Sequence, residues 1–213
     1  MHAPLLKICG LRHISQARAI ASLGVEAIGV IGVPGSPRYL EPAQRRPLFE
    51  AVAQISPTCL GVLVVADPDD GELGDLEGER GHRVLQLHGN ESPERCDFLR
   101  QRLGLPLWKA LRIREPQDLQ WVEDYSGVVD ALLLDAWVPD QLGGTGRRLP
   151  LNWLTSFFSP LPWWLAGGVT PETITEILSV IAPDGLDVSS GVEDAPGDKN
   201  LERVQTLLQR LRE

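Results

Sequence analysis

The segment Trp163–Gly191 reads WWLAGGVTPETITEILSVIAPDGLDVSSG and has two short apolar runs on either side of a helical pattern. The runs Trp163–Ala166 and Leu186–Val188 have the length and composition of buried strands. Between them, apolar residues recur at positions 174, 177, 178 and 181, which is the spacing of one helix face. A buried strand, a helix and a second buried strand in this order predict a parallel β-α-β unit.

The same alternation runs along the rest of the chain. Helical spacing recurs between most of six further strand candidates, which are Leu5–Ile8, Ala27–Ile31, Leu60–Val65, Val84–Leu87, Leu107–Leu111 and Val129–Leu134. Positions 201–211 complete the pattern with an amphipathic closing helix. Eight such units in about 200 residues are near the lower size limit of a (β/α)8 TIM barrel. We therefore predict an α/β fold with a single TIM-barrel domain over residues 1–213.

An open doubly wound sheet is the alternative architecture. Its dinucleotide-binding form needs a GxGxxG turn after the first strand, whereas this chain continues with Cys9-Gly10-Leu11-Arg12. The third crossover, Asp67–His82, is predicted to be short and irregular, because its four glycines would each cost a helix roughly 1 kcal/mol relative to alanine. Two helix starts are predicted where a capping residue precedes a proline, at Ser92-Pro93-Glu94 and Thr170-Pro171-Glu172.

Composition and charge argue against several classes of protein. The chain has 213 residues, of which 43% are hydrophobic and 23% charged, as in proteins that fold around a core. Its 29 acidic and 20 basic residues give a net charge of −9, which argues against a nucleic-acid partner because such binding needs a basic face. The longest uncharged apolar run, Cys59–Ala66, is too short to span a membrane, and no signal pattern is present. We therefore expect a cytoplasmic protein without a membrane partner.

Neither a disulfide framework nor a metal site is expected. The three cysteines are far apart and form no CxxC pair. Cys59, in an apolar strand, and Cys96, on a helix, are interpreted as packing residues. The spacing of metal ligands is also missing among His2, His13 and His82.

Four chemically versatile residues are predicted to face one rim of the barrel. Cys9 closes the first strand, Arg38 lies in the loop after the second, His88 closes the fourth and Asp135 closes the sixth. Active sites of TIM barrels lie at this carboxyl rim. Cys9 is a candidate nucleophile or general base through its thiolate, with a small core residue as the alternative. Asp135 is a candidate general acid because burial after an apolar strand favours its protonated form; a helix cap or a loop salt bridge is the alternative.

Three glycine-rich turns predict anion binding. They are Gly143-Gly144-Thr145-Gly146, Ala166-Gly167-Gly168 and Ser189-Ser190-Gly191. Glycine lets backbone amides approach an anion closely, and the last two turns follow strands seven and eight, where TIM barrels frequently bind phosphate. Arg38 could bind a second anion with two parallel hydrogen bonds, with an ordinary surface arginine as the alternative.

Six motifs in this order resemble those of the phosphoribosylanthranilate isomerase family of tryptophan biosynthesis. They are Lys7-Ile8-Cys9-Gly10, Ser36-Pro37-Arg38-Tyr39, Gln86-Leu87-His88-Gly89, Asp135 with Gly143-Gly144-Thr145-Gly146, Leu165-Ala166-Gly167-Gly168, and Asp187-Val188-Ser189-Ser190-Gly191-Val192-Glu193. The resemblance runs from about Leu5 to the C-terminus. It departs at Asp67-Pro68, where the family commonly has asparagine before proline, and at Gly197-Asp198-Lys199-Asn200, where Lys-Asp is usual.

The resemblance implies a (β/α)8 barrel that catalyses an Amadori rearrangement of a phosphosugar, N-(5-phosphoribosyl)anthranilate, without a cofactor or a metal. It implies that Cys9 is the general base and Asp135 the general acid. It places Arg38 on the anthranilate carboxylate. The remaining residues expected to bind substrate are His88, Gly144, Gly168, Ser190 and Gly191.

Two other functions compete with this interpretation. A histidine-pathway aldose–ketose isomerase performs similar chemistry but typically relies on an aspartate at the end of strand one, where this chain has Cys9. A barrel that binds phosphosugars without catalysis is the second alternative, and the presence of both Cys9 and Asp135 argues against it. We expect a small-molecule phosphosugar as the partner and either a monomer or a homodimer.

Overall fold

The chain folds into a closed barrel of eight parallel strands in a computed structural model that describes residues 3–138 and 146–212. The strands are β1 (Leu5–Cys9), β2 (Ala27–Ile31), β3 (Leu60–Val65), β4 (Val84–Leu87), β5 (Leu107–Ile113), β6 (Ala131–Ala136), β7 (Trp163–Ala166) and β8 (Gly185–Val188). β1 pairs with β8 from Leu5↔Gly185 to Ile8↔Val188, which closes the sheet. The predicted TIM barrel is thus confirmed.

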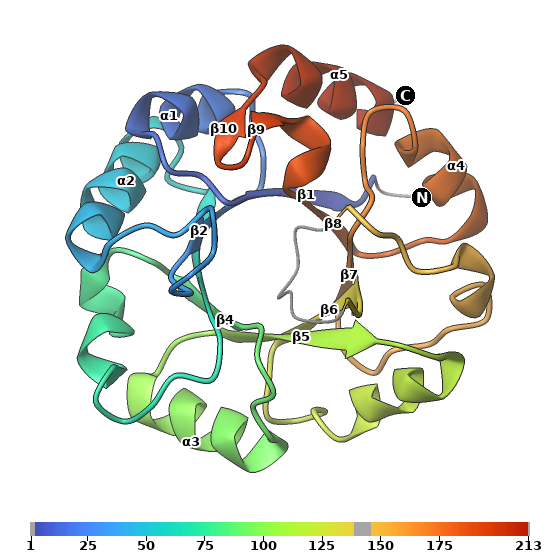
Figure 1. Cartoon of the computed structure of the whole chain (residues 1–213), viewed down its shortest axis with the longest axis horizontal. Helices are drawn as coiled ribbons and strands as arrows, with labels where there is room; N and C mark the ends of the chain where they lie inside the picture. The colour runs from blue at the N-terminus through green and yellow to red at the C-terminus, as the bar shows by residue number, and fades with distance from the viewer. Residues whose placement is uncertain (1–2, 139–145, 213) are drawn as a thin grey trace.

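Helical crossovers surround the barrel, as the view down its axis shows (Figure 1). The α-helices are α1 (Ile14–Ser22), α2 (Pro42–Ile55), α3 (Pro93–Leu103), α4 (Ile174–Val180) and α5 (Leu201–Arg212). Shorter 3-10 segments are η1 (Leu73–Asp75), η2 (Gly78–Arg80), η3 (Pro116–Glu123), η4 (Leu151–Trp153) and η5 (Ser190–Val192). A two-stranded hairpin, β9 (Glu193–Ala195) and β10 (Asp198–Lys199), lies between β8 and α5. No helix in residues 3–138 and 146–212 is long and apolar enough to cross a membrane.

The local predictions hold with one exception. The third crossover is irregular as expected, since it contains only η1 and η2. Ser92 caps α3, and its hydroxyl accepts a hydrogen bond from the amide of Arg95. The helix start predicted at Thr170 is wrong, because α4 begins at Ile174. The Thr170 hydroxyl instead accepts from the amides of Glu172 and Thr173 and holds a separate turn before the helix.

Apolar side chains fill both sides of the sheet and leave the carboxyl end of the barrel polar. Trp108 and Trp164 occupy the interior near the amino ends of their strands, with ring centroids 4.9 Å apart. Gly185 is required beside them, because a side chain there would collide with the Trp164 ring. Cys59 and Cys96 are buried in the layer between strands and helices, as interpreted from the sequence.

Candidate active site

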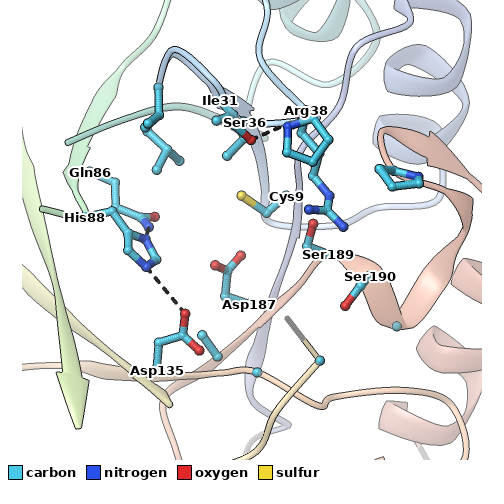
Figure 2. Close-up of a pocket in the computed structure, with 18 of the residues that line it drawn as sticks. Cys9, Ile31, Ser36, Arg38, Gln86, His88, Asp135, Asp187, Ser189 and Ser190 are labelled. Atoms are coloured by element: carbon cyan, nitrogen blue, oxygen red, sulfur yellow. Dashed lines mark hydrogen bonds and ion pairs between the residues drawn. The ribbon is translucent and has the colours of Figure 1, made fainter. Parts of the chain in front are cut away.

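A cavity of about 580 Å³ opens at the carboxyl ends of the strands, and Figure 2 shows the polar side chains that point into it. Alternation along the strands explains why they do, because residues two apart face the same side. Cys9 follows Lys7 in this way, and Asp135 follows Leu133 of the barrel interior. Every predicted site residue that the structure describes lines this cavity: Cys9, Arg38, His88, Asp135, Gly168, Ser190 and Gly191. Gly144 lies outside the described residues.

Cys9 lies at the end of β1 and is almost completely buried. Burial raises the pKa of the Cys9 thiol and the nearby Asp187 carboxylate raises it further, while Lys7 and Lys199 oppose both effects. The sulfur is therefore a neutral thiol near pH 7. This direction is opposite to that of a thiol activated by its neighbours, so a base at this position must first give up its proton.

Asp135 and His88 are neighbours and face each other on one side of the cavity (Figure 2). Asp135 Oδ1 accepts a hydrogen bond from the amide of Ala136 at 2.9 Å, and its Oδ2 lies 3.4 Å from His88 Nε2. A chain of contacts determines which nitrogen of His88 carries the proton. Lys7 Nζ donates to Gln86 Oε1 at 2.6 Å, so the Gln86 amide nitrogen is the group that faces His88 Nδ1, at 3.2 Å. Nδ1 therefore accepts, and the proton on Nε2 points toward Asp135.

Lys7 and Asp187 form a buried ion pair next to Cys9. Lys7 Nζ lies 3.1 Å from Asp187 Oδ1, and Lys7 is fully buried. Burial alone would lower the pKa of Lys7, but the charge of Asp187 reverses the shift, so the pKa is raised and the amine stays charged. The contact between Lys7 and Asp187 is an ion pair and not a hydrogen bond, and within the described residues Asp187 Oδ1 accepts no hydrogen bond. Sequence reasoning gave neither residue a role, although both are charged residues inside apolar strands.

Arg38 is a buried residue of the cavity wall and not a surface arginine. Its amide donates to the Ser36 hydroxyl at 3.2 Å, and its guanidinium is held by the Glu193 carboxylate. Gly10, with φ of 81°, leaves room for it, because a Cβ there would lie 2.5 Å from Arg38 Cδ. The sequence placed Arg38 correctly but contained no sign that Glu193 would be its partner.

The turns after β7 and β8 face each other and require glycine. Gly168 has φ of 65°, and a Cβ there would lie 2.7 Å from Arg148 Cβ. A Cβ at Gly191 would collide with the carbonyl of Val169. Gly168, Ser190 and Gly191 also border a second, more open hollow of about 830 Å³. Backbone and the Ser190 hydroxyl therefore line this end of the cavity, an arrangement suited to an anion such as phosphate.

The described part of the chain contains no group of three or more histidine, cysteine or acidic side chains placed to hold a metal ion. The groups that line the cavity are a thiol, carboxylates, an imidazole and a guanidinium, and the buried amine of Lys7 contacts one of these carboxylates. Such a set supports proton transfer to and from an anionic substrate.

Comparison with known proteins gives a consistent result. A family model described as N-(5'phosphoribosyl)anthranilate (PRA) isomerase matches residues 6–210. A relative from Synechococcus elongatus named N-(5'-phosphoribosyl)anthranilate isomerase is 48% identical over 207 residues, covering 97% of this chain and 95% of its own. A relative of the same name from Synechocystis is 44% identical over 204 residues, covering 95% of this chain and 93% of its own.

Solved structures agree with the sequence matches. The phosphoribosyl anthranilate isomerase of Thermus thermophilus superposes with a TM-score of 0.84 at 35% identity, with 98% of each chain covered. A phosphoribosyl anthranilate isomerase solved in complex with reduced 1-(o-carboxyphenylamino)-1-deoxyribulose 5-phosphate has a TM-score of 0.78 at 26% identity, again over 98% of each chain. Because the family match spans nearly the whole barrel, this chain belongs to the N-(5'-phosphoribosyl)anthranilate isomerase family.

Proposed function

We propose that this chain converts N-(5-phosphoribosyl)anthranilate to 1-(2-carboxyphenylamino)-1-deoxyribulose 5-phosphate with Cys9 as general base and Asp135 as general acid. The observation that carries the proposal is that both side chains point into one cavity that also contains Arg38 and the two glycine turns. The reaction needs one proton delivered and one removed on the same sugar, and an acid and a base in one cavity can do both.

Asp135 acts in the first step. In its protonated form it gives a proton to the furanose ring oxygen as the bond from that oxygen to C1 breaks. The lone pair of the anthranilate nitrogen then forms the C=N bond of a protonated Schiff base. The proton on His88 Nε2 points toward the carboxylate that is left and stabilises it, because the 3.4 Å separation allows an attractive interaction.

Cys9 acts in the second step. The Schiff base makes the proton on C2 acidic, because the C=N bond can take up the electron pair. The Cys9 thiolate removes this proton to give an enolamine, which becomes the ketone when C1 takes up a proton. Before this step the thiol must lose its own proton to solvent, and the Asp187 charge opposes that loss. Lys7 and Lys199 favour the thiolate electrostatically.

The two anionic ends of the substrate are bound by separate groups. We assign the anthranilate carboxylate to Arg38, and the phosphate to the turns that contain Gly168, Ser190 and Gly191. The relative solved with a reduced phosphosugar supports this class of ligand. We further propose one catalytic domain over residues 1–213, a cytoplasmic location, and a monomeric or homodimeric enzyme.

The test is turnover of phosphoribosylanthranilate, generated in situ and followed by fluorescence of the anthranilate group. We expect the wild type to turn over, and Cys9→Ala to lose about 10²- to 10⁴-fold in kcat while still binding a product analogue. Cys96→Ala is the matched control, because it removes a buried thiol on α3 away from the cavity. Unchanged kcat in Cys9→Ala would remove Cys9 from the mechanism. A folded wild type without turnover would favour a barrel that only binds phosphosugars.

A further inference from the structure

Glu193 holds the Arg38 guanidinium along one edge. Arg38 Nε lies 3.0 and 3.1 Å from the two carboxylate oxygens of Glu193, and Arg38 Nη2 donates to Oε2 at 2.7 Å. These contacts use the Nε–H and one Nη2–H of the five donors of a guanidinium. Every hydrogen bond of the Arg38 side chain in the described residues goes to Glu193, so the edge formed by Nη1 and Nη2 remains available.

Glu193 is itself firmly placed. Its Oε1 also accepts from Lys199 Nζ at 2.6 Å and from the amide of Gly197 at 3.0 Å. The side chain is only 5% exposed, and that of Lys199 is fully buried. The hairpin of β9 and β10 thus carries a buried carboxylate whose oxygens are all hydrogen-bonded. This carboxylate holds Arg38, which lines the cavity (Figure 2).

The buried cluster of Arg38, Glu193 and Lys199 has a net positive charge. Arg38 and Lys199 are cationic and Glu193 is anionic, so their sum is +1. Burial alone would raise the pKa of Glu193, but hydrogen bonds from Arg38 and the charge of Lys199 lower it overall, so the carboxylate stays ionised. Burial lowers the pKa of Lys199, and Glu193 counters this shift. Without Lys199, Arg38 and Glu193 would form a neutral pair with little attraction for an anion.

We propose that Glu193 and Lys199 are positioning residues of the carboxylate subsite. Glu193 holds Arg38 by the edge formed by Nε and Nη2, so that the edge formed by Nη1 and Nη2 can receive the substrate carboxylate with two parallel hydrogen bonds. Lys199 compensates the charge that Glu193 introduces, so that the cluster keeps its attraction for an anion. The inference rests on the proposed function, because that function assigns the anthranilate carboxylate to Arg38.

A purely structural role for the same contacts makes a different prediction. If Glu193 and Lys199 only tied the hairpin to the barrel, their loss would disturb the neighbouring loop after β8 as well. Lys199 Nζ lies 3.3 Å from the carbonyl oxygen of Ser189, so such damage would extend to the phosphate end of the site. Affinity for any phosphosugar would then fall, whether or not the ligand has a carboxylate.

The experiment compares two ligands by calorimetry. One is reduced 1-(o-carboxyphenylamino)-1-deoxyribulose 5-phosphate, and the other is its anilino counterpart, which lacks the carboxylate. The ratio of their Kd values reports the carboxylate subsite alone. The variants are Glu193→Gln, Lys199→Met and the double variant, with Arg38→Ala as the reference for complete loss. Glu50→Gln removes an exposed ion pair with Arg46 on α2 and serves as the control.

We expect each single variant to weaken the carboxylate ligand about tenfold or more, since charge-assisted hydrogen bonds are lost or left uncompensated. The anilino ligand should change less than about threefold. KM should rise with the first Kd in both single variants. In Glu193→Gln kcat should stay within about threefold, as expected for uniform binding. In Lys199→Met kcat should fall as well, because Lys199 favours the Cys9 thiolate. In the double variant the net charge returns to +1, so the carboxylate ligand should bind better than it does to Lys199→Met alone.

Two results would overturn the inference. One is an equal loss of affinity for both ligands, and the other is a double variant that binds the carboxylate ligand more weakly than either single variant. Both are measured by binding and do not depend on turnover. A wild type that binds both ligands without turning over substrate would instead overturn the proposed function, and the ratio of Kd values would still decide the role of Glu193 and Lys199.

Discussion

Asp135→Asn tests the proposed general acid with the least change in shape. Asparagine keeps an oxygen that can accept from the Ala136 amide at 2.9 Å, but its amide nitrogen then faces the proton of His88 Nε2 at 3.4 Å. If the introduced amide is rotated by half a turn, its nitrogen instead faces the Ala136 amide, which is also a donor. His88 Nε2 makes no hydrogen bond within the described residues, so the first orientation replaces an electrostatic attraction by two facing donors, and the second costs the Ala136 amide its partner. Either change should lower the free energy of unfolding, by up to about 1–3 kcal/mol.

The effect on turnover should be larger and should appear in kcat. An amide cannot deliver the proton, and loss of a general acid or base lowers the rate by about 10²- to 10⁴-fold, or about 2.7–5.5 kcal/mol in the barrier. KM should stay within about threefold, since neither anionic end of the substrate is assigned to Asp135. The assay is steady-state fluorescence on phosphoribosylanthranilate, beside thermal unfolding of each variant.

Asp118→Asn is the matched control. Asp118 is similarly buried, but its carboxylate accepts from the amides of Arg114 and Glu115 and does not line the cavity. This variant should lose stability and keep its kcat. If Asp135→Asn kept kcat within about tenfold of the wild type, Asp135 would not be the acid.

Two further predictions concern pH. Burial and Asp187 raise the pKa of Cys9 above its ordinary value of 9.0, so the thiolate absorbance that is lost in Cys9→Ala should increase with pH and reach no plateau below pH 9; a plateau already present below pH 7 would contradict the raised pKa. Burial lowers the pKa of His82 below 6.5, so the unfolded chain binds this proton more readily, and stability falls as pH drops below 6.5 until the folded histidine also titrates. Urea unfolding at pH 7.5 and 5.5 should therefore show a smaller loss for His82→Gln than for the wild type, and equal losses would contradict the assigned burial effect.

The strands were predictable because their signal is local. A run such as Leu60–Val65 is apolar throughout because it is buried on both faces, and its bounds agree with those of β3. The irregular third crossover was equally local, since its glycines oppose a helix whatever surrounds them. β5 extends beyond its apolar run to Ile113, because its polar Arg112 pairs in register with Asp135 of β6.

The site was predictable only in part. Cys9, His88 and Asp135 were found because polar residues at strand ends share one rim in any parallel barrel. The direction of the pKa shift of Cys9 was not predictable, because it depends on burial and on Asp187, which lies far away in the sequence.

Closure of the barrel decided the remaining contacts. Lys7 meets Gln86 and Asp187 only because β1 is bonded to β8 and faces β4 across the interior. Arg38 meets Glu193, 155 residues later, because the hairpin after β8 folds back over the loop after β2. Secondary structure follows from the period of apolar residues along the chain, whereas these ion pairs depend on the order and register of strands around a closed sheet. Side-chain pairs of that kind have no local pattern, so only the tertiary structure determines them.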